Sequence, residues 1–329
     1  MVKFLIIRFS SIGDIVLTTP VIRTLKNQVE GAEIHYLTKK TFAPVLVHNP
    51  YIDQLHVLDH SLNDAIKELK LVNFDYIIDL HHNLRTSIIK SRLNILAFSF
   101  NKLNIEKWLM VNFKVNRLPN LHIVDRYMKT TRLFDVQNDG KGLDYFIAPA
   151  DEINFNDLPE THRNGYVGFV IGAKHATKKL PSAKIVTIIQ KLKLPMVLLG
   201  GKEDSEEGDY IQKQFGELCF NACGKYNLGQ SASLVRQANV IITHDTGLMH
   251  IASAFKKKII SIWGNTIPEF GMYPYLPHPD SQIIEIKGLK CRPCTKIGYE
   301  SCPKKHFNCM NKIDEDNVIN LTKKCMAKR

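Results

Sequence analysis

One turn in the C-terminal half of the chain combines residue types that could bind a phosphate. The apolar run Val240–Ile242 ends at the polar turn His244–Gly247, and apolar residues then recur at helical spacing. The first backbone N–H groups of a helix lack partners and carry positive dipole charge, so they can bind an anion. Alternatively, Asp245 and Thr246 simply cap the helix and His250 is a packed helix histidine. The residues alone leave both interpretations open.

A second turn of this kind lies near the N-terminus. The segment Arg8–Asp14 separates an apolar run, Val2–Ile7, from a helical pattern. Asp14 would lie at the start of the helix, where the dipole keeps a carboxylate ionised and available as a base. The alternative is that Ser11 or Asp14 merely caps the helix. The pattern GxGxxG is missing from the sequence, so a dinucleotide fingerprint is not supported.

A third segment, Gly172–Pro181, also follows a strand-like run and precedes a helix-like one. Its small residues would let a ligand approach the backbone, and Lys178 and Lys179 supply positive charge, which suits a diphosphate. A solvated basic loop is the alternative. The segment lacks the spacing GxxxxGK[ST], so it is not a Walker A loop.

Four of the seven cysteines fall within one short segment: Cys291, Cys294, Cys302 and Cys309. A CxxC pair followed by two more cysteines favours a structural four-thiolate site for zinc or iron, with no direct catalytic role. His306 is a rival ligand, and reduced loop thiols or an occasional disulfide are the alternative. An odd cysteine count, in a sequence that does not start like a secretory signal, argues against a disulfide framework.

The elements that must position these residues alternate between strand and helix, which is typical of parallel sheets covered on both faces. We expect strands at Val2–Ile7, Glu33–Leu37, Leu55–Leu58, Tyr76–Leu80, Tyr166–Ile171, Met196–Leu199, Val240–Thr243 and Lys258–Trp263. We expect helices at Asp14–Gln28, Leu62–Leu71, Arg85–Arg92, Ser182–Leu192, Glu206–Phe215 and Asp314–Lys324. The polar, aperiodic segment Ala150–Asn164 predicts a linker between two α/β domains, residues 1–155 and 156–329.

The composition narrows the classes of protein without choosing one. The net charge of +12 favours an anionic partner such as a nucleotide, nucleic acid or acidic membrane surface, although a solvated surface explains it equally well. The basic residues are dispersed, which disfavours a zinc-containing nucleic-acid-binding protein. The Asp245–Gly247 triplet also occurs in aspartic proteases, but strand–helix alternation surrounds it here. No run of eighteen apolar residues predicts a membrane span, and we expect a cytoplasmic protein.

Taken together, these motifs resemble those of the bacterial glycosyltransferase family 9, typified by ADP-heptose–lipopolysaccharide heptosyltransferases. The resemblance runs through Arg8–Lys26, Asp75–Ser87, His122–Met128, Gly172–Pro181, His244–Ala254 and Cys291–Met310. It implies the GT-B fold, in which two Rossmann-like domains face each other across a cleft. Such folds often return the last helix to the first domain, so residues after about Asp316 are expected to pack there.

The resemblance also implies a role for each matching residue. Asp14 matches the catalytic base and Lys178 a lysine that offsets charge on the departing diphosphate, although Leu180 replaces the tryptophan that usually follows. The implied donor contacts are Thr177, Asp245, Thr246, Gly247, Leu248 and His250, with Asp245 assigned to sugar hydroxyls or to holding the loop. The implied acceptor contacts are Arg8, Ser11, Gly13 and Arg85, with Arg92, Arg117 and Arg126 as further basic residues facing an acidic glycolipid.

The reaction that the resemblance implies is an inverting transfer from a nucleotide-diphospho-sugar, with ADP-heptose as the expected donor and a lipopolysaccharide core as the acceptor. The chemistry is expected to need no metal or other cofactor. The expected partners are the nucleotide sugar and an acidic glycolipid, with peripheral association at the cytoplasmic face of the inner membrane and no nucleic acid. A different sugar donor, or a nucleotide-sugar epimerase of the same fold, is the alternative reading.

Overall fold

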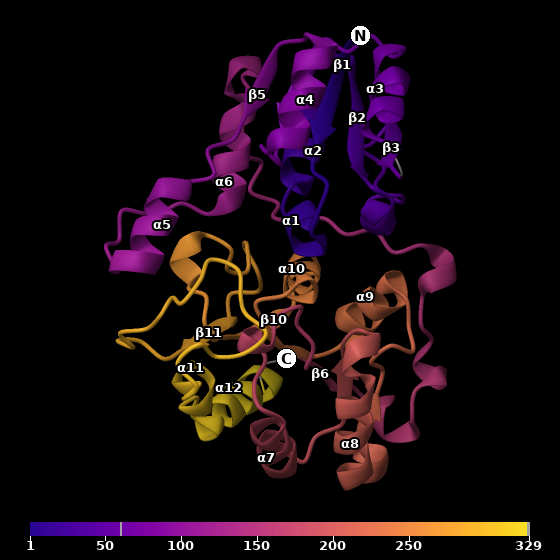
Figure 1. Cartoon of the computed structure of the whole chain (residues 1–329). Coiled ribbons are helices and arrows are strands. Elements are labelled where there is room, and N and C mark those ends of the chain that lie inside the picture. The colour runs from indigo at the N-terminus through magenta and orange to yellow at the C-terminus, as the bar shows by residue number, and fades with distance from the viewer. Residues whose placement is uncertain (60, 328–329) are drawn as a thin grey trace. The chain divides into compact units, whose positions relative to one another are not determined.

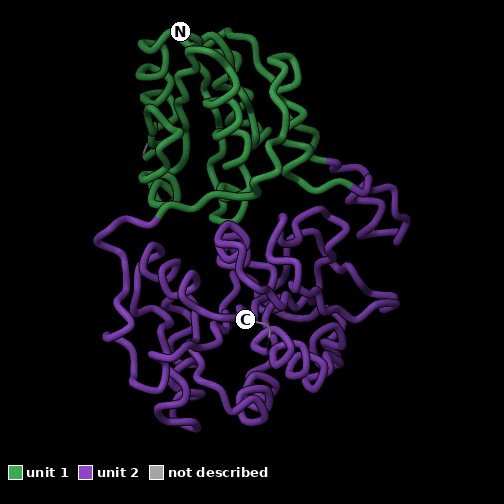
Figure 2. Tube along the Cα trace, turned by 180° about the vertical axis from the view of Figure 1, so that it is seen from behind, with its two compact units in different colours: residues 1–102, 121–146 green, residues 103–120, 147–329 purple. Residues whose placement is uncertain are grey.

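The computed structural model describes residues 1–59 and 61–327 (Figure 1). The chain divides into two compact units, which Figure 2 distinguishes by colour. Unit 1 comprises residues 1–102 and 121–146, and unit 2 comprises residues 103–120 and everything from residue 147 onward. The segment 147–155, which the sequence-based boundary assigned to the first domain, thus falls in unit 2. There Asn227 Nδ2 donates to Asp151 at 2.8 Å and Ser233 Oγ donates to Glu152 at 2.9 Å.

Unit 1 is built on a five-stranded parallel sheet with the strand order β3-β2-β1-β4-β5. Its strands are β1 (Val2–Ile7), β2 (Ala32–Lys39), β3 (Gln54–Leu58), β4 (Tyr76–Asp79) and β5 (Ala97–Ser99). Its α-helices are α1 (Ile12–Val16), α2 (Thr19–Gln28), α3 (Leu62–Lys70), α4 (Leu84–Leu93) and α6 (Ile123–Met128). The residues Phe4–Ile7 of β1 are fully buried because helices cover both faces of a parallel sheet.

Unit 2 is built on a six-stranded parallel sheet with the strand order β11-β10-β9-β6-β7-β8. Its strands are β6 (Val167–Val170), β7 (Met196–Leu199), β8 (Cys219–Asn221), β9 (Val240–His244), β10 (Lys258–Trp263) and β11 (Gln282–Glu285). Its α-helices are α5 (Asn104–Phe113), α7 (Ser182–Leu192), α8 (Ser205–Phe215), α9 (Leu228–Gln237), α10 (Gly247–Ala254), α11 (Asn308–Asn311) and α12 (Glu315–Ala327).

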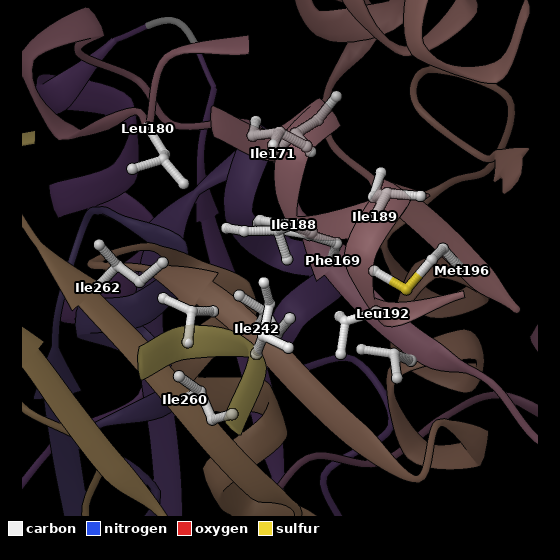
Figure 3. Close-up of a cluster of buried hydrophobic side chains, with 14 of the residues drawn as sticks. Phe169, Ile171, Leu180, Ile188, Ile189, Leu192, Met196, Ile242, Ile260 and Ile262 are labelled. Atoms are coloured by element: carbon white, nitrogen blue, oxygen red, sulfur yellow. The ribbon is translucent and has the colours of Figure 1, made fainter. Parts of the chain in front are cut away.

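The core of unit 2 lies between the sheet and α7 (Figure 3). Ile188 and Ile189 of α7 pack there with Phe169 of β6 and Ile242 of β9. The last helix, α12, contributes Val318 and neighbouring apolar residues to this same core and contacts α7, β9 and β10. The expectation that the last helix packs on the first domain is therefore wrong, because the apolar side of α12 is already buried within unit 2.

The single helix expected at residues 14–28 is two helices, α1 and α2. Pro20 has no N–H to donate to the carbonyl of Val16, and the hydroxyl of Thr19 donates to that carbonyl instead at 2.8 Å. The hydroxyl of Thr18 bonds back to the carbonyl of Ile15 at 2.7 Å. Local side-chain bonds thus end α1 and start α2. None of the helices within residues 1–59 and 61–327 is both long and apolar enough to cross a membrane.

Candidate active site

The side chain of Asp14 is held at both of its oxygens. Oδ1 forms an ion pair with the guanidinium of Arg8 at 2.7 Å, and Oδ2 accepts from the backbone N–H and the hydroxyl of Ser11 at 3.2 and 2.8 Å. Arg8 lies just after β1 and Asp14 in the first turn of α1, so the turn between them brings the two charges together. Asp14 therefore does cap the helix, as one interpretation of the sequence held, but 22% of its side chain stays exposed.

Arg8 is itself fixed by the interior of unit 1. Its guanidinium donates to the carbonyls of Ser10 and Leu80 at 2.7 and 2.6 Å, and to the hydroxyl of Tyr127 at 3.1 Å. Burial alone would lower the pKa of Arg8, but the charge of Asp14 more than offsets this and the pKa is raised. The guanidinium is thus a permanent positive partner that orients the Asp14 carboxylate from the end of β1.

The remaining residues expected to contact the acceptor are dispersed over several elements. Gly13 is buried inside α1, and Arg85 is exposed in the first turn of α4. Arg92 donates to Asn63, Arg126 is only 4% exposed, and Arg117 belongs to unit 2 instead of unit 1. Among the predicted residues of unit 1, Arg8 and Ser11 both contact Asp14 directly.

In unit 2, the turn after β9 brings together Asp245 and Lys178. The ammonium of Lys178 pairs with Asp245 Oδ2 at 2.5 Å and donates to the backbone carbonyl of the same residue at 3.3 Å. The hydroxyl of Thr266, in the loop after β10, donates to the same carboxylate oxygen at 3.0 Å. Lys178 and Asp245 were expected to have separate roles, yet the structure places them in one ion pair, with side chains 16% and 12% exposed.

The backbone N–H groups that were predicted to bind a phosphate lie where that turn becomes a helix. Thr246 is the N-cap of α10, with extended backbone, and Gly247 and Leu248 are its first two residues. The N–H groups at this start have no carbonyl one turn earlier to bond to, which is the arrangement that binds anions. His250 follows within the same helix and is 2% exposed.

Thr177 lies beside this turn but its hydroxyl is engaged within the protein. The hydroxyl donates to the carbonyl of Tyr299 at 3.0 Å and accepts from the N–H of Tyr299 at 2.8 Å. Lys179 likewise pairs with the buried carboxylate of Asp204. In this structure these side chains tie the segment 174–181 to its surroundings.

His244 is a residue whose role the sequence did not predict. It is the last residue of β9 and fully buried, and its Nε2 accepts the backbone N–H of Leu180 at 3.0 Å. Burial, together with the nearby charge of Lys179, lowers the pKa of His244 to about 4. A neutral imidazole therefore joins the end of β9 to the segment that carries Lys178. The only signal in the sequence was its place directly before Asp245.

The loop after β10 contains a further residue that sequence reasoning missed, Asn265. It is 1% exposed, and neither the nitrogen nor the oxygen of its side-chain amide has a hydrogen-bond partner in the described part of the chain. The next residue, Thr266, contacts Asp245. A buried amide left unpaired is costly, so this position is a candidate contact for a bound ligand.

The cysteine-rich loop braces the loop after β10. Arg292, between the first two cysteines, donates to the carbonyls of Gly264 and Thr266 at 2.6 and 2.7 Å and pairs with Glu285 at 2.7 Å. The N–H of Cys294 donates to the carbonyl of Asn265 at 3.3 Å. The loop that carries the cysteines therefore supports the residues that hold Asp245.

The four clustered cysteines are neighbours in space. Burial raises the pKa of Cys294 to about 11, and the thiols of Cys291 and Cys302 contribute to this shift. Burial and the other three thiols raise the pKa of Cys309 to about 11. The sulfur of Cys291 lies 3.8 Å from Nε2 of the rival ligand His306. Across residues 1–59 and 61–327, no three His, Cys, Asp or Glu side chains are arranged, as they stand, to hold a metal ion.

Each unit is a parallel-sheet α/β unit in which a polar turn joins a strand to a helix, and such turns at the carboxyl ends of strands are where open α/β sheets bind ligands. The model of glycosyltransferase family 9 (heptosyltransferase) matches residues 63–304. The chain therefore belongs to this family, as its motifs predicted, and is a glycosyltransferase. The matched range contains the turn at Asp245 and the first three clustered cysteines, but it begins after Asp14 and ends before Cys309.

The chain is similar along most of its length to characterised members of that family. It is 24% identical over 293 residues to lipopolysaccharide heptosyltransferase 1 of Campylobacter coli, covering 80% of this chain and 84% of that protein. A family 9 glycosyltransferase from Veillonella parvula has a similar structure, with a TM-score of 0.79 and 22% identity. The match covers 99% of this chain and 98% of that chain. The ADP-heptose lipopolysaccharide heptosyltransferase II of Escherichia coli gives a TM-score of 0.76, 19% identity, and coverage of 98% of each chain. The predicted GT-B fold is confirmed.

Proposed function

We propose that this enzyme transfers heptose from ADP-heptose to a lipopolysaccharide core, with inversion at the anomeric carbon. The observation that carries the proposal is the Asp14 carboxylate, which Arg8 and Ser11 hold at its two oxygens while part of it stays exposed. A carboxylate fixed in this way is suited to accept a proton from a sugar hydroxyl. The names of the relatives, which are heptosyltransferases, support the donor and the acceptor.

In the proposed reaction, Asp14 takes the proton of an acceptor hydroxyl as that oxygen attacks the anomeric carbon. The bond from this carbon to the diphosphate breaks, its electron pair leaves with the nucleoside diphosphate, and a single displacement inverts the configuration. The N–H groups of Thr246, Gly247 and Leu248 stabilise the charge that develops on the departing diphosphate. The amide of Asn265 and the side chain of His250 are further candidates for donor contacts.

The experiment that tests this proposal is a donor screen by titration calorimetry with ADP-, GDP- and UDP-sugars. ADP-heptose should bind most tightly, and its consumption should require a lipopolysaccharide core acceptor. Preference for another nucleotide would overturn the donor assignment. Consumption of the donor without any acceptor would overturn the transferase assignment in favour of an epimerase.

We also propose that the cysteine cluster, comprising Cys291, Cys294, Cys302 and Cys309, holds a structural zinc or iron ion. Four thiols within one short loop match the ligand set of such sites, and rotation of these side chains would be needed to bring the sulfurs onto one ion. The pKa values of Cys294 and Cys309 are raised, so the thiolate forms of these two residues need a cation nearby, and a bound metal supplies one. The metal would hold the loop that carries Arg292.

Elemental analysis of the purified full-length chain tests the metal site. We expect about one metal ion per chain, lost in Cys294→Ser together with thermal stability. Cys325→Ser is the matched control because Cys325 lies on α12, outside the cluster, and is even more buried than the half-buried Cys294; this variant should therefore keep the metal. A parent chain without metal, or a Cys294→Ser variant that retains it, would contradict the proposal.

A further inference from the structure

Helix α5 exposes its apolar side chains. Ile105, Trp108 and Phe113 are 73%, 55% and 62% exposed, and Val115, just after the helix, is 43% exposed. None of the ten residues of α5 is buried. Exposed apolar side chains elsewhere, such as Leu71 and Tyr210, are ordinary when they occur singly. Here four of them lie within eleven residues, so α5 presents an apolar surface and not the polar face that a surface helix usually shows.

The spacing of two of these residues places them on one face of the helix, and a ring contact joins a third residue to them. Ile105 and Trp108 are three residues apart, so they are neighbours on one helix face. Phe113 extends this face, because its ring packs edge-on against Trp108 with the centroids 5.2 Å apart. We call this face, formed by Ile105, Trp108, Phe113 and Val115, the α5 apolar face.

Positive charge borders the α5 apolar face. Residues 102–120 contain four basic residues, Lys102, Lys107, Lys114 and Arg117, and the single acidic residue Glu106. The ammonium of Lys114 donates to the carbonyls of Val111 and Pro293, both at 2.6 Å. This contact anchors the end of the helix to the cysteine-rich loop through backbone carbonyls, so the lysine keeps its positive charge.

We infer that the α5 apolar face docks on the surface of an anionic phospholipid membrane. Helices that lie in a membrane interface combine an apolar face, often with tryptophan, and flanking lysine and arginine residues that attract acidic headgroups. Tryptophan favours this interface because its ring has an apolar body and a polar N–H. The α5 segment has each of these features.

The size of the face favours a membrane over a second copy of the chain. Four side chains with these exposed fractions offer on the order of 400 Å² of surface, whereas a stable protein interface buries about 800 Å² on each partner. A membrane interface needs no matched partner surface. The inference depends on the α5 segment alone and would stand even if the donor or the acceptor were different from those proposed.

The two tryptophans of the chain make the contact directly measurable, because Trp263 is 1% exposed and Trp108 is the exposed one. The full chain is mixed with vesicles of phosphatidylcholine, with or without phosphatidylglycerol, and with brominated acyl chains as a quencher. We expect quenching of Trp108 with the mixed vesicles and little with phosphatidylcholine alone. No quenching with the mixed vesicles would overturn the inference.

A double variant tests whether the apolar face carries the binding. Ile105→Ser with Phe113→Ser keeps the fluorophore and should weaken vesicle binding about tenfold or more. Tyr210→Ser is the matched control, because Tyr210 is 59% exposed on α8, and it should bind as the parent does. Equal binding by the double variant would overturn the inference. A second result would also overturn it: the parent chain is a dimer that does not bind vesicles, and the double variant is a monomer. In that case a second copy of the chain would cover the α5 apolar face.

Discussion

Replacement of Asp14 by asparagine should remove most of the transfer activity and leave donor binding unchanged. A general base contributes roughly 10²- to 10⁴-fold to a rate, equivalent to about 3–5 kcal/mol of transition-state stabilisation. An amide cannot accept the proton. It also fits poorly, because the Arg8 guanidinium and the two groups of Ser11 that face it are hydrogen-bond donors. The expected result is a fall in kcat of that size, measured by release of ADP, with the donor Kd within about twofold of the parent value.

The structure supplies a matched control for this substitution. Asp139, also in unit 1, pairs with the buried Arg23 at 2.7 Å, the same distance that separates Asp14 from Arg8. Asp139→Asn therefore removes a comparable ion pair and should lower stability while kcat stays close to that of the parent. The assignment of Asp14 as the base is refuted if Asp14→Asn retains more than about a third of the parental kcat, or if Asp139→Asn loses as much activity as Asp14→Asn.

Three further substitutions probe the surroundings of the site. Arg292→Gln should weaken donor binding about tenfold, because Arg292 holds the loop that carries Thr266; calorimetry that finds an unchanged Kd would contradict this. Asn265→Leu should raise the thermal stability of the ligand-free chain, since an amide whose nitrogen and oxygen are both unpaired is removed, yet lower donor affinity; unchanged or higher affinity would exclude Asn265 as a donor contact. Burial alone would raise the pKa of Asp79, but hydrogen bonds from Lys90, from the backbone of His82 and from Thr86, with the charge of Lys90, together outweigh it and the pKa is lowered. Asp79 therefore adds stability above about pH 4 that is lost as the pH falls further, and Lys90→Met should flatten this dependence in urea unfolding.

Buried strands were the most predictable part of the fold, and local side-chain chemistry was the least. The strands β1, β6, β7, β9 and β10 could be predicted because a parallel strand covered on both faces reads as a continuous apolar run. Helix α9 was missed although it has a readable start, a capping box in which Asn227 and Gln230 bond to each other's backbone N–H groups. Helix α5 was missed for a different reason. Its apolar residues face outward, so its pattern is not that of a helix packed on a sheet.

In the candidate site, too, the positions next to strands could be predicted and the side-chain contacts could not. Asp14 and Asp245 could be predicted because each follows an apolar strand and precedes a helix, which is where sheets of this type bind ligands. The contact of Thr266 with Asp245 spans 21 residues, and the bond from Leu180 to His244 spans 64. Such contacts depend on which strands become neighbours in the sheet, and one sequence does not specify strand order. Asn265 gave no signal at all, because nothing in its sequence context reveals that its amide is buried without partners.

The ion pair between Lys178 and Asp245 changes how the proposed phosphate-binding turn would work. A carboxylate at the start of α10 would repel a diphosphate, and the sequence alone left open whether Asp245 caps the helix, holds the loop or contacts sugar hydroxyls. Lys178 and Thr266 both bond to this carboxylate, so its charge is neutralised before any donor binds. The attraction for the diphosphate must then come chiefly from the helix start itself, through the N–H groups of Thr246, Gly247 and Leu248. Lys178 consequently has a structural task even in the free enzyme. Its loss should therefore disturb the turn first and weaken the interaction with the leaving group only as a consequence.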